Sequence, residues 1–149
     1  MAKLRFMLIG CGRISKNHIA AAAANKDTMT LAVVCDVVRA RAEEKAAMLK
    51  EQAGYEPLIY TDYKKALQEQ EIDVCAIATE SGFHAQIALE CMAHGKHVLT
   101  EKPMALSTAD AEKMISTAEA KGLTLGVCHQ NRFNAPIQQL HAALDAGRF

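Results

Sequence analysis

The chain has 149 residues, half of them hydrophobic, and it carries 17 basic and 17 acidic side chains. This length fits one domain with its own core, residues 1–149, and the composition excludes a disordered chain. The balanced charge gives no indication of a nucleic-acid or membrane-surface partner. No apolar run approaches the roughly 20 residues that span a bilayer, and the N-terminal run is not typical of a signal peptide.

Five cysteines stand at positions 11, 35, 75, 91 and 128, without a CxxC pair. Cys35, Cys75 and Cys128 lie within apolar runs, which favours small buried side chains over ligands. We expect no disulfide and no metal site, because free thiols of this kind suit a reducing cytoplasm.

Short strand-like runs alternate with longer helical runs along the chain. The predicted strands are residues 4–10, 31–36, 58–60, 73–79, 97–100 and 123–129. The predicted helices are residues 15–25, 39–52, 63–69, 83–94, 108–121 and 134–146, with Asp62 and Ser107 as N-caps and Gly122 as a C-cap. The central strands are continuously apolar, which is typical of strands buried on both faces of a parallel sheet. The sequence therefore predicts an α/β fold with a doubly wound parallel sheet, the Rossmann type.

The first predicted strand leads directly into the turn Gly10-Cys11-Gly12-Arg13-Ile14-Ser15. Gly10 permits a tight turn, and Gly12 has no Cβ, so a pyrophosphate can approach the backbone there. The N-terminus of the next helix would then offer free N–H groups to that anion. A plain strand-to-helix turn is the alternative, but the acid that ends the second strand favours a dinucleotide site.

Asp36 ends the second predicted strand, 24 residues after Gly12. A carboxylate at this place can accept hydrogen bonds from both adenosine ribose hydroxyls and would repel a 2′-phosphate, which favours NAD over NADP. Arg39 keeps NADP open as an alternative, since a nearby arginine can bind that phosphate. A turn-forming role for Asp36 at the strand end is the structural alternative.

The predicted strand 97–100 leads into Glu101-Lys102-Pro103. Ligands of open parallel sheets bind beyond the carboxyl ends of the strands, so Lys102 stands where chemistry is expected. A lysine beside a substrate hydroxyl can orient it and help its proton leave while a hydride departs. Taken alone, a loop lysine of this kind is more often simply solvated.

Together these features resemble the glucose–fructose oxidoreductase and inositol dehydrogenase family. The resemblance covers the whole chain and rests on GCGRISKNH (10–18), VVCD (33–36), AIATESGFHAQIALECMAHGKHVLTEKPMA (76–105) and HQNRF (129–133). Within the family, the chain is most similar to dehydrogenases that oxidise the 3-hydroxyl of UDP-N-acetylglucosaminuronic acid for polysaccharide biosynthesis. The resemblance implies a cytoplasmic, NAD-dependent enzyme that moves a hydride between a sugar or sugar-nucleotide carbon and nicotinamide.

The resemblance also implies which residues hold NAD. The expected cofactor-binding set is Gly10, Gly12, Arg13, Ile14, Asp36, Thr79, His84, Glu101, Lys102, Asn131 and Arg132. Lys102 is the expected catalytic residue, while Asn131 and Arg132 would face the cofactor end and the sugar nucleotide. His18 matches a family position on the first helix, where we expect it to pack or to cap.

Members of this family are longer than this chain. Their second, β-rich domain supplies a catalytic histidine, most of the sugar pocket and the oligomer contacts, and it is absent from this sequence. We therefore expect the cofactor domain of a homo-oligomeric enzyme, without useful activity alone. A stand-alone dinucleotide-binding module is the main alternative. A methyltransferase on the same fold is another, and the Glu-Lys-Pro segment argues against it.

Overall fold

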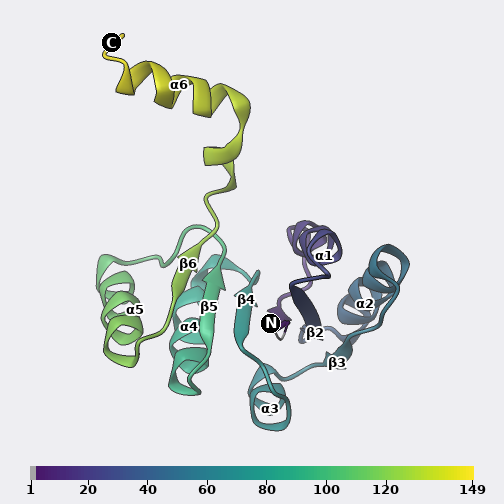
Figure 1. The fold of residues 1–149 in the computed structure, drawn as a ribbon. Helices are drawn as coiled ribbons and strands as arrows, with labels where there is room; N and C mark the ends of the chain where they lie inside the picture. Colours follow the sequence, from purple (N-terminus) through teal and green to yellow (C-terminus); the bar gives the residue numbers. More distant parts are fainter. Residues whose placement is uncertain (1–2) are drawn as a thin grey trace.

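The computed structural model describes residues 3–149 and shows a parallel sheet with helices on both faces (Figure 1). The strands are β1 (Leu4–Ile9), β2 (Met29–Cys35), β3 (Leu58–Tyr60), β4 (Val74–Ile77), β5 (His97–Thr100) and β6 (Leu125–Val127). They pair in the order β3-β2-β1-β4-β5-β6, and every pair is parallel. This order is that of the doubly wound dinucleotide-binding fold, so the predicted fold class is confirmed.

Each predicted helix is present, and the predicted caps hold the helix ends. The helices are α1 (Ser15–Ala24), α2 (Arg39–Ala53), α3 (Tyr63–Glu69), α4 (His84–Ala93), α5 (Thr108–Lys121) and α6 (Ala135–Asp145), with short 3-10 turns η1 (Ser81–Phe83) and η2 (Gln130–Phe133). The side chains of Asp62 and Ser107 accept the N–H groups of Lys64 and Asp110, which the first helical turn leaves without partners. Gly122 ends α5 with left-handed backbone, φ 64°.

Three strands have boundaries that differ clearly from those predicted. β4 and β6 are shorter at both ends than residues 73–79 and 123–129. Beyond Ile77 and Val127 the chain turns into loops at the carboxyl edge, after Ala78 and Cys128 have each donated one more hydrogen bond to the neighbouring strand. β2 begins at Met29, two residues early, since Met29 and Thr30 pair with the first residues of β1. An apolar run indicates that its residues are buried, but it does not indicate at which residue the hydrogen bonds between neighbouring strands begin or end.

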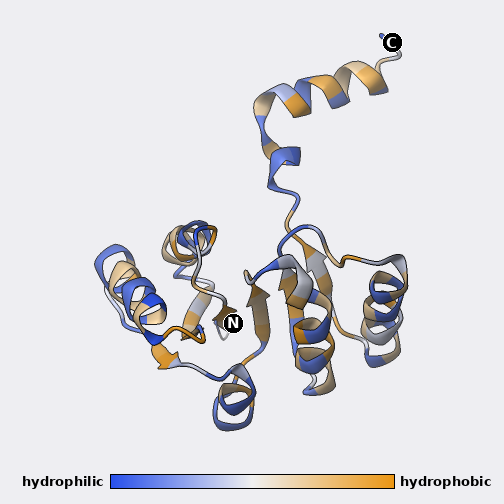
Figure 2. Ribbon diagram, turned by 180° about the vertical axis from the view of Figure 1, so that it is seen from behind, coloured by the Kyte–Doolittle hydropathy of each residue, from blue (hydrophilic) through white to orange (hydrophobic). Residues whose placement is uncertain are grey.

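The two faces of the sheet have separate apolar cores. Leu8 belongs to the core formed with α1 and α2, which includes Ile19. Its neighbour Met7 belongs to the other core, formed with α3, α4 and α5, which includes Met114. Successive residues of a strand point to opposite faces, so a strand with cores on both faces must be apolar throughout. The wholly apolar strand β4, orange near the centre of Figure 2, is an example.

The segment η2–α6 extends away from the sheet (Figure 1). Helix α6 has no buried residue, although it carries the apolar side chains of Ile137, Leu140 and Leu144 (Figure 2). The layered unit thus comprises the six strands and α1 to α5. Among residues 3–149, no helix combines the length and the apolar character that crossing a bilayer requires.

All five cysteines are free, and their burial differs from the prediction at one position. Cys35 and Cys75 are buried as expected, but Cys128 is only partly buried. The prediction for Cys128 is wrong because β6 ends at Val127, so this thiol lies in the loop beyond the strand.

Candidate functional site

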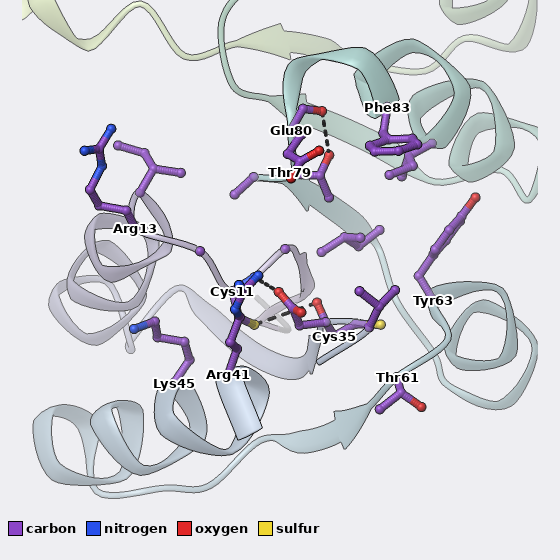
Figure 3. Close-up of a pocket in the computed structure, with 18 of the residues that line it drawn as sticks. Cys11, Arg13, Cys35, Arg41, Lys45, Thr61, Tyr63, Thr79, Glu80 and Phe83 are labelled. Carbon is purple, nitrogen blue, oxygen red and sulfur yellow. Dashed lines mark hydrogen bonds between the residues drawn. The ribbon is translucent and has the colours of Figure 1, made fainter. Parts of the chain in front are cut away.

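A pocket of about 1000 Å³ opens at the carboxyl edge of the sheet (Figure 3). Its walls come from the ends of β1, β2 and β4 and from α2, where the strand order reverses between β1 and β4. Such a reversal leaves a crevice, since the connections leave on opposite faces of the sheet. Six of the predicted site residues line this pocket: Gly10, Gly12, Arg13, Ile14, Asp36 and Thr79.

Gly10 is required by the way the first turn crosses the end of β4. Its φ is +94°, a left-handed value that other residues rarely adopt. A Cβ on Gly10 would lie 2.6 Å from the carbonyl of Ala78 and 2.7 Å from the nitrogen of Thr79. Gly12 differs, because a Cβ there would meet no atom within 4 Å. The space beside Gly12 is therefore open on the pocket side of the turn.

The turn presents an electropositive surface to the pocket. Within residues 3–149, the N–H groups of Gly12, Arg13 and Ile14 donate no hydrogen bond. The first turn of α1 contains no acidic residue, and the exposed Arg13 lines the pocket. Unpaired N–H groups at the positive end of a helix dipole, next to an arginine, suit a phosphate or pyrophosphate.

The Asp36 carboxylate is held in a fixed position and still borders the pocket. It is 8% exposed, and its two oxygens accept the N–H groups of Cys11 and Val38, each at 2.8 Å. Each oxygen keeps further acceptor capacity for a ligand hydroxyl. Asp36 therefore organises the strand-end turn and can also bind ribose, so the two roles considered for it do not exclude each other.

The basic side chains near Asp36 are not the expected ones. Arg39 pairs with Glu43 at 2.8 Å on the exposed side of α2 and does not line the pocket. Arg41 and Lys45 line it instead, together with Glu44 (Figure 3). Neither Arg41 nor Lys45 is among the residues predicted for the site, although their spacing along α2 indicates a shared position. Residues 41, 44 and 45 share one helical face, which turns toward the pocket once α2 follows Asp36.

The inner wall of the pocket contains neutral, weakly acidic groups. Burial is the main cause that raises the pKa of both the Cys11 and the Cys35 thiols to about 12, and the Asp36 carboxylate adds to it. Burial, reinforced by Glu90, raises the pKa of Tyr63 to about 12. These groups remain protonated at neutral pH. They therefore act as an apolar lining and not as nucleophiles.

The remaining predicted residues gather at the other end of the same sheet edge. Lys102, Asn131 and Arg132 line a second, smaller hollow of about 220 Å³ between the end of β5 and η2. Lys102 is exposed, and its peptide bond to Pro103 is cis. Glu101 is buried at the end of β5, where its N–H bonds to the carbonyl of Ile77. The site thus has two parts, one beyond β1 and β2 and the other beyond β5 and β6.

His84 lies beneath the site and joins its two parts. The side chain is 1% exposed, and the ring nitrogens Nδ1 and Nε2 contact the carbonyl oxygens of Pro103 at 2.8 Å and Thr79 at 3.1 Å. His84 therefore ties the Glu-Lys-Pro loop to the end of β4. Its observed contacts are with this framework, whereas the family resemblance implies that it borders the cofactor.

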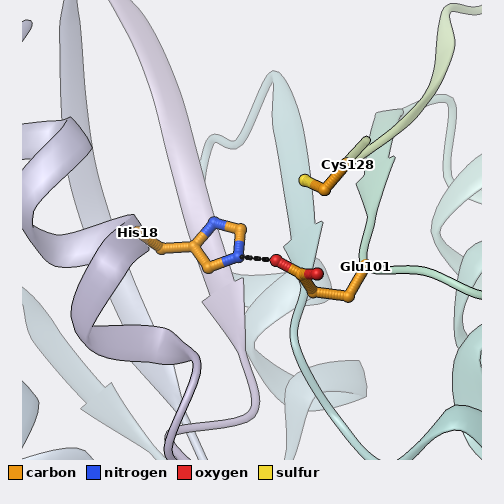
Figure 4. Close-up of side chains that lie close together, drawn as sticks. All are labelled: His18, Glu101 and Cys128. Atoms are coloured by element: carbon orange, nitrogen blue, oxygen red, sulfur yellow. Dashed lines mark hydrogen bonds and ion pairs between the residues drawn. The ribbon is translucent and has the colours of Figure 1, made fainter. Parts of the chain in front are cut away.

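His18, Glu101 and Cys128 meet between the two parts (Figure 4). The Nε2 atom of His18 lies 3.0 Å from Oε1 of Glu101. This polar contact connects α1 to the end of β5, and the expected packing or capping role of His18 stays a prediction beside it. Burial, with a further contribution from Glu101, raises the pKa of the Cys128 thiol to about 11.

Comparison with known proteins identifies the family. Residues 4–129 match the model described as "Oxidoreductase family, NAD-binding Rossmann fold", which represents glucose–fructose oxidoreductases and inositol dehydrogenases. The chain belongs to this family. The match covers the sheet and α1 to α5, and it ends before α6.

Individual relatives are similar over almost the whole chain. The 4-carboxy-2-hydroxymuconate-6-semialdehyde dehydrogenase of Sphingobium sp. is 30% identical over 97% of this chain and 44% of its own length. The scyllo-inositol 2-dehydrogenase (NADP(+)) IolU of Bacillus subtilis is 35% identical over 92% of this chain and 40% of its own length. The crystal structure of the WlbA dehydrogenase from Bordetella pertussis, in complex with NADH and UDP-GlcNAcA, is 36% identical, with a TM-score of 0.87 over 99% of this chain and 43% of that chain.

These alignments establish how much of a relative this sequence represents. The chain spans 40–44% of the length of the three proteins. The matched residues 4–129 correspond to the NAD-binding Rossmann part of the family.

Proposed function

We propose that residues 1–149 are the cofactor domain of an NAD-dependent dehydrogenase that oxidises a hydroxyl carbon of a sugar or sugar nucleotide. One observation carries this proposal: the carboxyl edge of a single sheet holds both the Asp36 pocket and the Lys102 hollow. Three strand spacings separate the end of β2 from the end of β5, which is roughly 15 Å at the usual interval. An extended dinucleotide with its adenosine at Asp36 would cross the glycine turn and reach Lys102.

Each residue has a proposed role that follows from its position along the carboxyl edge of the sheet. The N–H groups of the glycine turn and Arg13 would bind the pyrophosphate, and Asp36 would bind the adenosine ribose. NAD, when bound, accepts the hydride that leaves the substrate carbon. Lys102 would orient the reacting hydroxyl and stabilise negative charge on its oxygen as the proton leaves.

The proposed substrate is a UDP-linked sugar acid, oxidised at its 3-hydroxyl. The similarity to the WlbA dehydrogenase, crystallised with NADH and UDP-GlcNAcA, supports this choice. So does the basic character of the Lys102 hollow, since Arg132 stands beside Lys102 and can pair with a carboxylate or phosphate.

We also propose a cytoplasmic location, which suits five free cysteines, and a homo-oligomer formed through a further domain.

The test is Lys102→Met in a protein that carries this domain together with a substrate domain. The variant keeps the side-chain length and removes the charge. A catalytic role predicts near-parental NAD affinity and thermal stability, with turnover of the UDP-sugar acid reduced at least about 100-fold. If turnover stays within a few-fold of the parent, Lys102 is a solvated loop residue and the proposed mechanism fails.

The isolated chain provides a second measurement. We expect it to bind NADH without turning over a UDP-sugar, because the hollow at Lys102 is too small to enclose such a substrate. Steady NAD reduction by residues 1–149, at the roughly 1–1000 per second typical of enzymes, would contradict this expectation.

A further inference from the structure

The sequence alone predicts no metal site, but the fold brings three possible ligands together. His18 comes from α1, Glu101 follows β5, and Cys128 follows β6, so the three are far apart along the chain (Figure 4). One ligand atom of each lies within 4.8 Å of the other two, and they form the only such group of three in the described range 3–149. A nitrogen, an oxygen and a sulfur atom thus converge on one point at the carboxyl edge of the sheet.

The spacing of these atoms is close to that around a metal ion. Nε2 of His18 and Oε1 of Glu101 are 3.0 Å apart. Bond lengths of about 2.1 Å to both atoms would place them roughly 3.4 Å apart on a tetrahedral ion. The same geometry places a thiolate sulfur roughly 3.6 Å from each of them, with a bond of about 2.3 Å. The sulfur of Cys128 lies within 4.8 Å of both atoms, so a shift of its side chain by on the order of 1 Å would admit a cation.

We propose that His18, Glu101 and Cys128 bind a thiophilic divalent cation of the zinc class, with the fourth position left to water. A set of one imidazole, one carboxylate and one thiolate suits Zn²⁺ and its analogues Co²⁺ and Cd²⁺, and not Mg²⁺ or Ca²⁺. The site is accessible, since 14% of the His18 side chain and 10% of the Glu101 side chain are exposed and Cys128 is partly buried.

The cation would be a reversible ligand and not a structural one. His18 and Glu101 already satisfy each other through their hydrogen bond, so the fold does not depend on an ion between them. A bound ion would replace that hydrogen bond and release the thiol proton of Cys128. It would also place positive charge next to Lys102, which follows Glu101 directly. The binding itself does not depend on the proposed function, because it requires no nucleotide.

Cobalt provides a direct test on the reduced chain. Titration with Co²⁺ should produce a near-ultraviolet thiolate-to-cobalt charge-transfer band that saturates at one ion per chain, and Zn²⁺ should abolish it. Cys11, Cys35, Cys75 and Cys91 are all buried, so a band in the folded protein reports on Cys128. Cys128→Ser should remove the band, and His18→Gln should weaken binding at least about tenfold.

His94→Gln is the matched control. His94 also lies near a glutamate, with Nδ1 3.9 Å from Oε1 of Glu90, but within residues 3–149 it belongs to no group of three ligands. This variant should leave the cobalt affinity unchanged. Circular dichroism verifies the fold of each variant, and Cys128→Ala is a second thiol-free protein. The absence of a charge-transfer band at a large molar excess of Co²⁺, or a band that survives both Cys128 variants, would overturn the proposal.

Discussion

Gly10 and Gly54 both have left-handed backbone, with φ of +94° and +82°, but their surroundings differ. A Cβ at Gly10 would overlap the backbone of Ala78 and Thr79, whereas one at Gly54 would meet nothing within 4 Å. Gly10→Ala should therefore lower the free energy of unfolding by about 2–5 kcal/mol, from backbone strain plus overlap. Gly54→Ala should lower it by about 1–2 kcal/mol, from strain alone.

Urea unfolding of both variants measures this difference. Gly12→Ala is the control within the same turn, because its φ is not left-handed and its Cβ would be free of contacts. It should leave the stability within about 0.5 kcal/mol of the parent. Equal losses for Gly10→Ala and Gly54→Ala would show that the turn does not press against β4.

Asp36 should determine the choice between NAD and NADP. In Asp36→Asn the carboxylate charge is lost while the shape is kept, so repulsion of a 2′-phosphate disappears and the ribose hydrogen bonds weaken. We expect the affinity for NAD to fall about 10- to 100-fold, the range for a hydrogen bond to a charged group, and its preference over NADP to shrink. Calorimetry with both cofactors measures these values.

Two arginine variants distinguish the effect of Asp36 on cofactor affinity from the effects of the arginines near it. Arg39→Ala should change neither affinity, because Arg39 pairs with Glu43 and does not line the pocket. Arg41→Ala should weaken the binding of both cofactors, since Arg41 lines the pocket. Parental protein that binds NADP as tightly as NAD would contradict the assigned role of Asp36.

Among the elements, α5 and α6 make very unequal contributions to stability. Met114 of α5 is 0% exposed in the core, whereas Leu144 of α6 is 55% exposed on a helix without a buried residue. Met114→Ala should cost about 2–5 kcal/mol of unfolding free energy, because it leaves a cavity. Leu144→Ala should cost less than about 0.5 kcal/mol. Thermal unfolding measures both, and a large loss in Leu144→Ala would show that α6 packs on the sheet in solution.

For the whole molecule, the buried thiols predict that stability declines in alkali. The folded state raises the pKa of Cys11 and Cys35 from 9.0 to about 12, so it keeps protons that the unfolded chain releases above pH 9. Stability is therefore complete below pH 9 and falls between pH 9 and 12, by on the order of 1 kcal/mol per pH unit for each thiol.

Urea unfolding in buffers from about pH 8 to 11 checks this linkage. Cys35→Ala should reduce the slope of stability against pH by about one thiol's share, whatever its effect at neutral pH. The slope is the informative quantity, because a cavity or a packing change alters the free energy of unfolding by the same amount at every pH. A parental slope of zero above pH 9 would contradict the burial argument.

The sequence by itself determined the fold class, the order of the elements and the residues that meet at the Asp36 pocket. These depend on local chemistry. Continuous apolar runs require burial on both strand faces, Gly10 and Gly12 follow β1 directly, and Asp36 follows β2 directly. In a parallel sheet all such strand ends meet at one edge, so order along the chain is enough to bring them together.

Only the tertiary structure decided which distant side chains meet. The contact of His18 with Glu101, the approach of Cys128 and the bridge from His84 to Pro103 and Thr79 depend on how helices and loops pack. The choice of Arg41 over Arg39 as the pocket arginine depends on the rotation of α2. Such contacts are set by packing free energies summed over many residues, and no single local motif encodes them.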